Sequence, residues 1–162
     1  MYSTSRGFAS DSVVDFEVVL ATGDVVHANA QENSDLWMAL KGGLNNFGIV
    51  TSFKMRTFES ANIWGGAIYY TPEAFPQFLD RACDYVSTET DENTHLMVGV
   101  GYAYGHEVIV ALMYQTTGQE NAPSLQRFTS VQPQIEQMSS MRTATHISFC
   151  DELSNFTKDG TR

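Results

Sequence analysis

The stretch Asp35-Leu-Trp-Met-Ala-Leu-Lys-Gly-Gly-Leu-Asn-Asn-Phe-Gly-Ile-Val-Thr51 decides the local fold of the first part of the chain. Its two leading leucines lie four residues apart, the spacing of one helical face. Asn33 or Ser34 is expected to cap the start of this helix, because both side chains can accept a hydrogen bond from its free N–H groups. Gly42 and Gly43 end it, since glycine tolerates the positive φ of a helix C-terminus. The stretch therefore predicts a short helix, a glycine turn and a strand.

Strands are predicted on both sides of this helix. Downstream, apolar and polar residues alternate, and the side chains expected to share one face are Ile49, Thr51, Phe53 and Met55. Upstream, residues 13–20 alternate in the same way, with Val14, Phe16, Val18 and Leu20 on one face. Turn residues at 21–24 then lead into an extended segment at 25–29, which predicts a β-hairpin.

The rest of the chain predicts a mixture of strands and helices. The expected elements are a strand at 62–70, a helix around 75–86 whose first turn Pro76 distorts, strands at 95–102 and 107–115 joined around Tyr104, a helix at 125–131, and a last helix opened by the capping-box pattern Ser148-Phe-Cys-Asp151. This order, with its antiparallel hairpins, predicts the α+β class. A boundary near residues 58–62 divides the chain into 1–59 and 60–162.

Composition limits the partners. With 43% hydrophobic and 12% aromatic residues among 162, the chain has a globular profile. Its net charge of −10 disfavours binding to nucleic acid or to an anionic membrane surface. The N-terminal residues lack the apolar stretch of a signal peptide, and no apolar run is long enough to span a bilayer.

Metal and nucleophile chemistry has weak support in the sequence. The histidines are His27, His95, His106 and His146, and none is expected to lie at helical ligand spacing from another histidine, a cysteine or a carboxylate. Cys83 and Cys150 show no metal-ligand spacing, and Cys83 is expected to pack. No metal site and no catalytic residue are therefore predicted.

The glycines after the helix have two readings. Gly42, Gly43 and Gly48 can serve simply as a helix end and a connector. They can also let the backbone approach a ligand closely, with exposed N–H groups that hold an anion. Residue types alone leave both readings open.

Several sequence blocks, in order, point to a known family. They are Gly7-Phe-Ala-Ser-Asp-Ser-Val-Val14, Phe16-Glu-Val-Val-Leu-Ala21, Asn33-Ser-Asp-Leu-Trp37, Ala39-Leu-Lys-Gly-Gly43 and Asn46-Phe-Gly-Ile-Val-Thr51. They resemble the PCMH-type FAD-binding domain of the vanillyl-alcohol oxidase type, in particular the berberine-bridge-enzyme-like, oxygen-dependent FAD-linked oxidoreductases. The resemblance is strong from Arg6 to Phe58, and beyond it only the element order and Asp159-Gly-Thr-Arg162 fit. It implies the second subdomain of the flavin domain at 1–59 and part of an antiparallel-sheet substrate domain at 60–162.

The resemblance also implies FAD as cofactor and a set of cofactor-binding residues. The segment from Gly7 through Ser10 and Asp11 would lie against the flavin. The backbone of Ile49 and Val50 would meet the adenine, and Gly42, Gly43 and Gly48 would permit that approach. Trp37 and Phe47 are expected to pack instead.

The chain departs from the family pattern in three places. Ser12 replaces an asparagine, and Leu44 stands where many members have a third glycine. Ser10 matches the position at which some members link FAD to cysteine. A hydroxyl is a poor substitute for a thiolate, so that link is not expected here.

The family reaction sets the functional expectation. Hydride would pass from a small organic substrate to flavin, with O₂ as acceptor, and the protein would orient the reactants. Tyr69, Tyr70, Tyr102 or Tyr114 would face the flavin ring, or else these tyrosines are ordinary strand residues. Family members are much longer, so a fragment is expected, to which no catalytic base can be assigned. The alternative is a truncated, non-catalytic remnant that acts at most as a binding module. No nucleic-acid, membrane or protein partner is expected.

Overall fold

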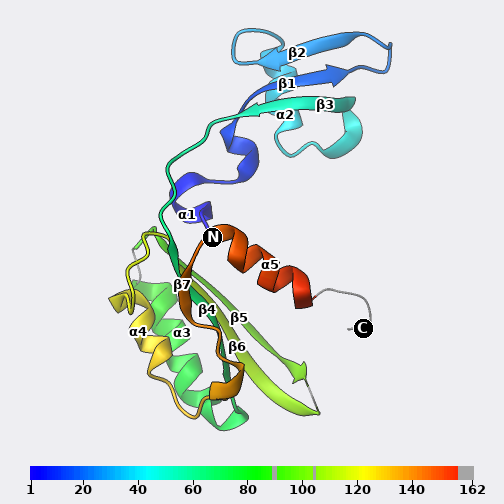
Figure 1. The fold of residues 1–162 in the computed structure, drawn as a ribbon. Coiled ribbons are helices and arrows are strands. Elements are labelled where there is room, and N and C mark those ends of the chain that lie inside the picture. Colours follow the sequence, from blue (N-terminus) through cyan, green and yellow to red (C-terminus); the bar gives the residue numbers. More distant parts are fainter. Residues whose placement is uncertain (89–90, 104, 157–162) are drawn as a thin grey trace. The chain divides into compact units, whose positions relative to one another are not determined.

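The computed structural model describes residues 1–88, 91–103 and 105–156 (Figure 1). The chain forms two compact units. The N-terminal unit is Ser5–Glu59, and the C-terminal unit is Ser60–Arg162 together with Met1–Thr4. The sequence-based division also lies between residues 59 and 60, but it places Met1–Thr4 with the first part. Tyr104 and the Asp159–Arg162 motif lie outside the described residues.

The N-terminal unit is a three-stranded antiparallel sheet with one packed helix. Its elements are α1 (Ser3–Arg6, which begins before the unit), η1 (Ala9–Ser12), β1 (Val13–Val19), β2 (Val25–Asn29), α2 (Ser34–Leu40), η2 (Leu44–Asn46) and β3 (Ile49–Met55). The strand order is β2-β1-β3, which confirms the predicted hairpin and the strand after the glycine turn.

Helix α2 packs on one face of this sheet. The buried residues are Val13, Phe16, Val18 and Ala28, and Leu36, Trp37 and Leu40 of α2 pack against them. The Trp37 indole also donates a 3.1 Å hydrogen bond to the Val13 carbonyl, so its expected packing role is confirmed. The expected cap is wrong: Asn33 precedes the helix with φ 48°, and its amide donates instead to the His27 carbonyl at 2.7 Å.

Two register shifts change which side chains share a face. Between β1 and β3, Val14 is an extra residue on β1, and Thr51 is an extra residue on β3. A bulge of this kind interrupts strict alternation. Val13 is consequently buried instead of Val14, and Ile49 lies on the face opposite to Phe53. The predictions that Val14 belongs to the face of Phe16 and that Ile49 belongs to the face of Phe53 are therefore wrong.

The C-terminal unit is built on a four-stranded antiparallel sheet of order β5-β6-β4-β7. Its elements are β4 (Ile63–Tyr70), η3 (Pro72–Ala74), α3 (Phe75–Thr88), β5 (Thr94–Ala103), β6 (His106–Gln115), α4 (Pro123–Thr129), η4 (Glu136–Met138), β7 (Arg142–Ala144) and α5 (His146–Phe156). A 3₁₀ turn precedes α3, so Pro76 falls in the helix's first turn, where its missing N–H is tolerated. The α+β class is confirmed.

Helices cover parts of both faces of this sheet (Figure 1). On one face, α3 and α4 bury a core that includes Tyr70, whose hydroxyl donates to the Phe128 carbonyl at 3.0 Å. Burial raises the pKa of Tyr70 well above its usual value. On the other face, α5 inserts Phe149 against Tyr114, with ring centroids 5.2 Å apart.

Candidate functional site

The first group of predicted cofactor residues lies in the turn before β1. Gly7 has φ +74°, and a Cβ there would lie 2.6 Å from Asp11 Oδ2. That same oxygen accepts the Phe8 N–H at 2.8 Å. Asp11 therefore holds the turn closed over Gly7, and Ser10 sits half-buried within it.

The second group lies between α2 and β3. Gly42 (φ +121°) and Gly48 (φ +138°) both adopt conformations that side chains rarely accept. A Cβ at Gly43 would lie 2.2 Å from the Ala39 carbonyl oxygen, and one at Gly48 would lie 2.6 Å from that of Val19. Contacts within the chain thus explain Gly43 and Gly48. Of these three glycines, only Gly42 would place a Cβ in open space.

Leu44 in the same turn shows what the family pattern requires there. It adopts φ +55° and is 83% exposed. This left-handed conformation favours glycine, which is the residue that many family members have at the matching position. The leucine keeps the shape of the turn without glycine.

The structure does not bring the two groups together. Because β1 and β3 are antiparallel, Val13 pairs with Met55 and Val19 pairs with Ile49. The Gly7 turn precedes Val13, whereas Gly48 leads into Ile49, so the groups lie at opposite ends of β1. That strand spans about 20 Å at the usual rise per residue. Only an elongated ligand could contact both groups.

Strand β3 is an exposed edge. All seven of its residues are exposed, including Ile49 at 71%, Val50 at 39% and Phe53 at 60%. One row of backbone N–H and C=O groups on an edge strand points away from its neighbour. The start of β3 therefore offers backbone hydrogen-bonding groups beside apolar side chains.

The four tyrosines of the C-terminal unit have different surroundings. Tyr70 is buried against α3 and α4, and Tyr114 is buried under α5. Tyr102 pairs with Glu107 on the face of Ile109, and its hydroxyl donates to the Gly105 carbonyl at 2.7 Å. Tyr69 is the half-buried tyrosine on the α5 face beyond Tyr114. Tyr70 and Tyr114 are therefore packed strand residues, as the alternative reading has it, whereas Tyr69 and Tyr102 lie on opposite faces of the sheet.

The α5 face of the C-terminal sheet is lined mostly by apolar residues. By strand pairing, this face carries Gly65, Ala67, Tyr69, His95, Met97, Gly99, Gly101, Val108, Val110, Leu112 and Tyr114. Met97 is 51% exposed, and a Cβ at Gly101 would meet no atom within 4 Å. Burial lowers the pKa of His95, which favours its neutral form. The face is therefore mostly apolar.

The His146–Cys150 pair contradicts the prediction that no histidine lies at helical ligand spacing from a cysteine. His146 and Cys150 are four residues apart on α5, with Nε2 and Sγ at 3.9 Å. That is helical ligand spacing, which the sequence interpretation had excluded. In the described part of the chain, no group of three or more potential metal ligands gathers, and no described helix is long and apolar enough to cross a membrane.

The N-terminal sheet also carries an exposed ion pair. His27 Nδ1 lies 2.9 Å from Asp15 Oδ2, and Asn29 donates to Asp15 Oδ1 at 2.8 Å. The hydrogen bond to Asp15, with its charge, raises the pKa of His27. The hydrogen bonds from Asn29 and His27 lower the pKa of Asp15.

This pair predicts a pH dependence of the β1–β2 hairpin. The stabilisation is complete below the ordinary histidine pKa of 6.5 and is lost as the pH rises through the raised pKa of His27. Because the pair is exposed, salt should weaken the effect. Urea unfolding followed by hydrogen exchange across this pH range measures it. A His27→Gln variant should lose the pH dependence, and an equal dependence in that variant would contradict the assignment.

The relatives found by comparison with known proteins include FAD-dependent monooxygenases. The chain is 53% identical over 72 residues to an FAD-dependent monooxygenase of Cercospora nicotianae, covering 44% of this chain and 16% of that protein. It is 36% identical over 140 residues to an FAD-dependent monooxygenase of Penicillium roqueforti, covering 80% of this chain and 26% of that protein. The chain thus spans about a quarter or less of these relatives. No family model matches it.

Solved structures share the fold over almost the whole chain. 6-Hydroxy-D-nicotine oxidase from Arthrobacter nicotinovorans matches 98% of this chain and 35% of that one, with a TM-score of 0.84 at 20% identity. BBE-like 1 from Physcomitrella patens matches 98% of this chain and 34% of that one, with a TM-score of 0.75 at 22% identity. In sequence this chain is similar to FAD-dependent oxidoreductases, and it shares the fold of vanillyl-alcohol-oxidase-type and BBE-like flavoproteins, which confirms the resemblance carried by its motifs.

Proposed function

We propose that this chain is a segment of an FAD-linked oxidoreductase in which hydride passes from a small organic substrate to the flavin and O₂ is the electron acceptor. The observation that carries the proposal is the exposed outer edge of β3. It begins at Ile49 and Val50, the residues that the family resemblance assigns to the adenine.

The residues present fit FAD in two respects. FAD is an elongated molecule, and the two groups of predicted residues lie at opposite ends of β1. Gly42 leaves open space where any other residue would place a Cβ. The fit does not extend to a covalent link at Ser10, because serine has no thiol with which to form one.

Each group has its own part in this proposal. The backbone of Ile49 and Val50 would donate to and accept from the adenine ring, as an unpaired strand edge can. The turn of Gly7, Ser10 and Asp11 would lie along the flavin end. FAD, when bound, supplies the hydride acceptor, and the chain's residues supply its position and the exclusion of water.

The C-terminal unit would supply a surface for the substrate. Its α5 face presents Tyr69 and Met97 among glycines and aliphatic residues. Such a mostly apolar face suits a small organic molecule with an apolar body.

A second candidate is a module that binds flavin without turnover. The match spans only 26% of the Penicillium enzyme, and no residue of this chain has been assigned as a catalytic base. Under this alternative, the purified chain produces no substrate-dependent H₂O₂ even when FAD is bound.

Titration of the purified chain with FAD, followed by flavin absorbance and fluorescence, tests the proposal. We expect saturable binding that Gly42→Val weakens at least about tenfold, since a tenfold loss corresponds to only about 1.4 kcal/mol. Gly23→Val is the matched control, because Gly23 also has positive φ and open space but lies in the β1–β2 turn. Absence of saturable binding, or equal loss in both variants, would overturn the assignment of the cofactor to the β3 edge.

A further inference from the structure

We infer that His146 and Cys150 on α5 form a two-residue site for a thiophilic divalent cation, with Zn²⁺ as the expected ion. The site uses a part of the chain that the flavin proposal does not use. The two can therefore fail independently.

The distance between the two candidate ligand atoms suits a shared ion. His146 Nε2 and Cys150 Sγ are 3.9 Å apart. With usual Zn–N and Zn–S lengths and tetrahedral angles, the two ligand atoms of one Zn²⁺ lie about 3.5 Å apart. A small rotation of either side chain closes the difference, so no backbone movement is required.

The helix that carries the pair is firmly held within its unit. Phe149 lies between the two ligands in sequence, is fully buried, and packs edge-on against Tyr114. Arg142 lies 4.4 Å above the Phe149 ring and pairs with the Glu152 carboxylate. These contacts fix the rotation of α5 and therefore the direction of its exposed face.

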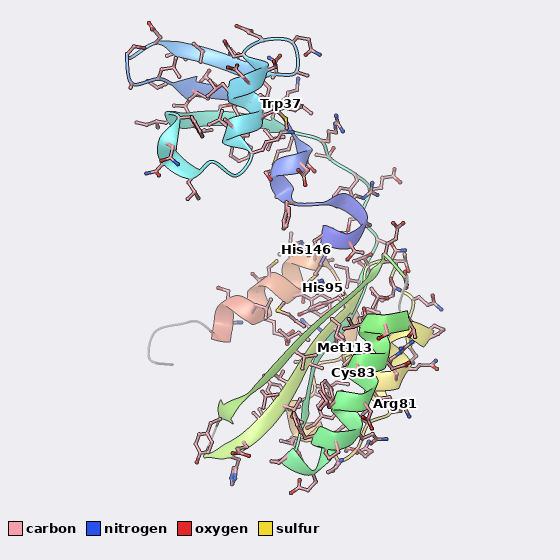
Figure 2. The ribbon with its side chains drawn as sticks, turned by 180° about the vertical axis from the view of Figure 1, so that it is seen from behind. Trp37, Arg81, Cys83, His95, Met113 and His146 are labelled. Atoms are coloured by element: carbon pink, nitrogen blue, oxygen red, sulfur yellow. The ribbon has the colours of Figure 1, made fainter. Side chains whose placement is uncertain are left out.

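Both ligands are exposed and face each other. His146, which Figure 2 labels, and Cys150 are both exposed. The Tyr2 and His146 ring centroids are 5.8 Å apart in a T-shaped arrangement, which restricts the orientation of the imidazole. The exposed carboxylate of Asp151 is next in sequence to the thiol. The net charge of −10 further favours a cation over an anion.

The ion type follows from the donor set. One thiolate and one imidazole are ligands preferred by Zn²⁺ and other thiophilic ions, whereas Mg²⁺ and Ca²⁺ prefer oxygen. On binding, the Cys150 thiol releases its proton to solvent as the Sγ–Zn bond forms, and neutral His146 binds through Nε2. No electron is transferred. Water completes the remaining coordination positions.

Titration of the full chain with Co²⁺ tests the site directly, because thiolate ligation gives a sulfur-to-cobalt charge-transfer band. We expect one equivalent of Co²⁺ to bind with this band, and Zn²⁺ to displace it. Cys150→Ser should abolish the band, and His146→Ala should weaken the affinity at least about tenfold, the lower end of the loss seen when even indirect partners of a metal are removed. Cys83→Ser is the matched control, since Cys83 is the other exposed cysteine and lies on α3 (Figure 2).

A measurement on the unaltered chain makes the test independent of the variants' folding. Zn²⁺ should slow alkylation of Cys150, followed by mass spectrometry, and leave alkylation of Cys83 unchanged. A band that persists in Cys150→Ser, an affinity unchanged in His146→Ala, or equal protection of both cysteines would overturn the inference.

Discussion

Gly48→Val is expected to lower the free energy of unfolding of the N-terminal unit by about 2–6 kcal/mol. Gly48 has φ +138°, and its Cβ would lie 2.6 Å from the Val19 carbonyl oxygen and 2.7 Å from Val18 Cγ1. Backbone strain costs roughly 1–3 kcal/mol, and overpacking adds about 1–3 kcal/mol. Val18 is fully buried under α2, so the disturbance should reach the Trp37 helix as well.

Hydrogen exchange of peptides from β1 and β3 measures this loss in the N-terminal unit alone. Gly42→Val is the control, because Gly42 has a similarly positive φ but nothing within 4 Å of its Cβ. Gly42→Val should therefore lose only the stability that backbone strain costs, without the further loss caused by steric overlap. Equal destabilisation by both substitutions would mean that the contact with β1 does not matter.

The contacts of the glycine turn at residues 42–48 change its functional meaning. The sequence left two readings open for Gly42, Gly43 and Gly48. Contacts to Ala39 and Val19 explain two of the three within the chain itself. The cofactor proposal therefore depends on Gly42 and the β3 edge more than on the turn as a whole.

Local sequence patterns predicted most elements of the fold. The hairpin, helix α2 and the strands β3 to β6 follow from alternation, spacing and turn residues near each element. Strand β7 was not predicted, because three residues, Arg142–Ala144, are too few to show a period. Helix α5 begins at His146 and not near Ser148, since the Thr145 hydroxyl accepts the Ser148 N–H at 3.4 Å.

Side-chain faces were less predictable than the strands themselves. The extra residues Val14 and Thr51 depend on how β1 pairs with β3, and a single strand carries no signal of its partner's register. The same limit applies to the tyrosines. Tyr70 and Tyr69 are neighbours that point to opposite faces, and only the packing of α3 and α4 decides which is buried.

The candidate site was predictable only through the family resemblance. Nothing in residue type or spacing places Gly7 and Gly48 at opposite ends of one strand; the antiparallel pairing does so. The His146–Cys150 pair is different, because its four-residue spacing is visible in the sequence. It was missed because the last helix was expected to begin after His146.

Removal of the Phe149 ring tests how firmly α5 is attached. Phe149→Ala is expected to lower the free energy of unfolding of the C-terminal unit by about 3–5 kcal/mol, the usual cost of removing a buried aromatic ring. The ring is fully buried with Ile63 and Tyr114, and it receives the Arg142 guanidinium on its face. Its loss leaves a cavity that the paired strands β4 and β6 cannot close by moving inward.

Urea unfolding monitored by near-ultraviolet circular dichroism measures the effect, since the Tyr114 ring loses its edge-on partner in this variant. Ile147→Ala is the matched control on the same helix, because Ile147 is 71% exposed. Surface substitutions of this kind usually change stability by less than about 0.5 kcal/mol. If the two variants lost similar stability, helix propensity and not burial would hold α5 in place, and the fixed orientation assigned to its exposed face would be wrong.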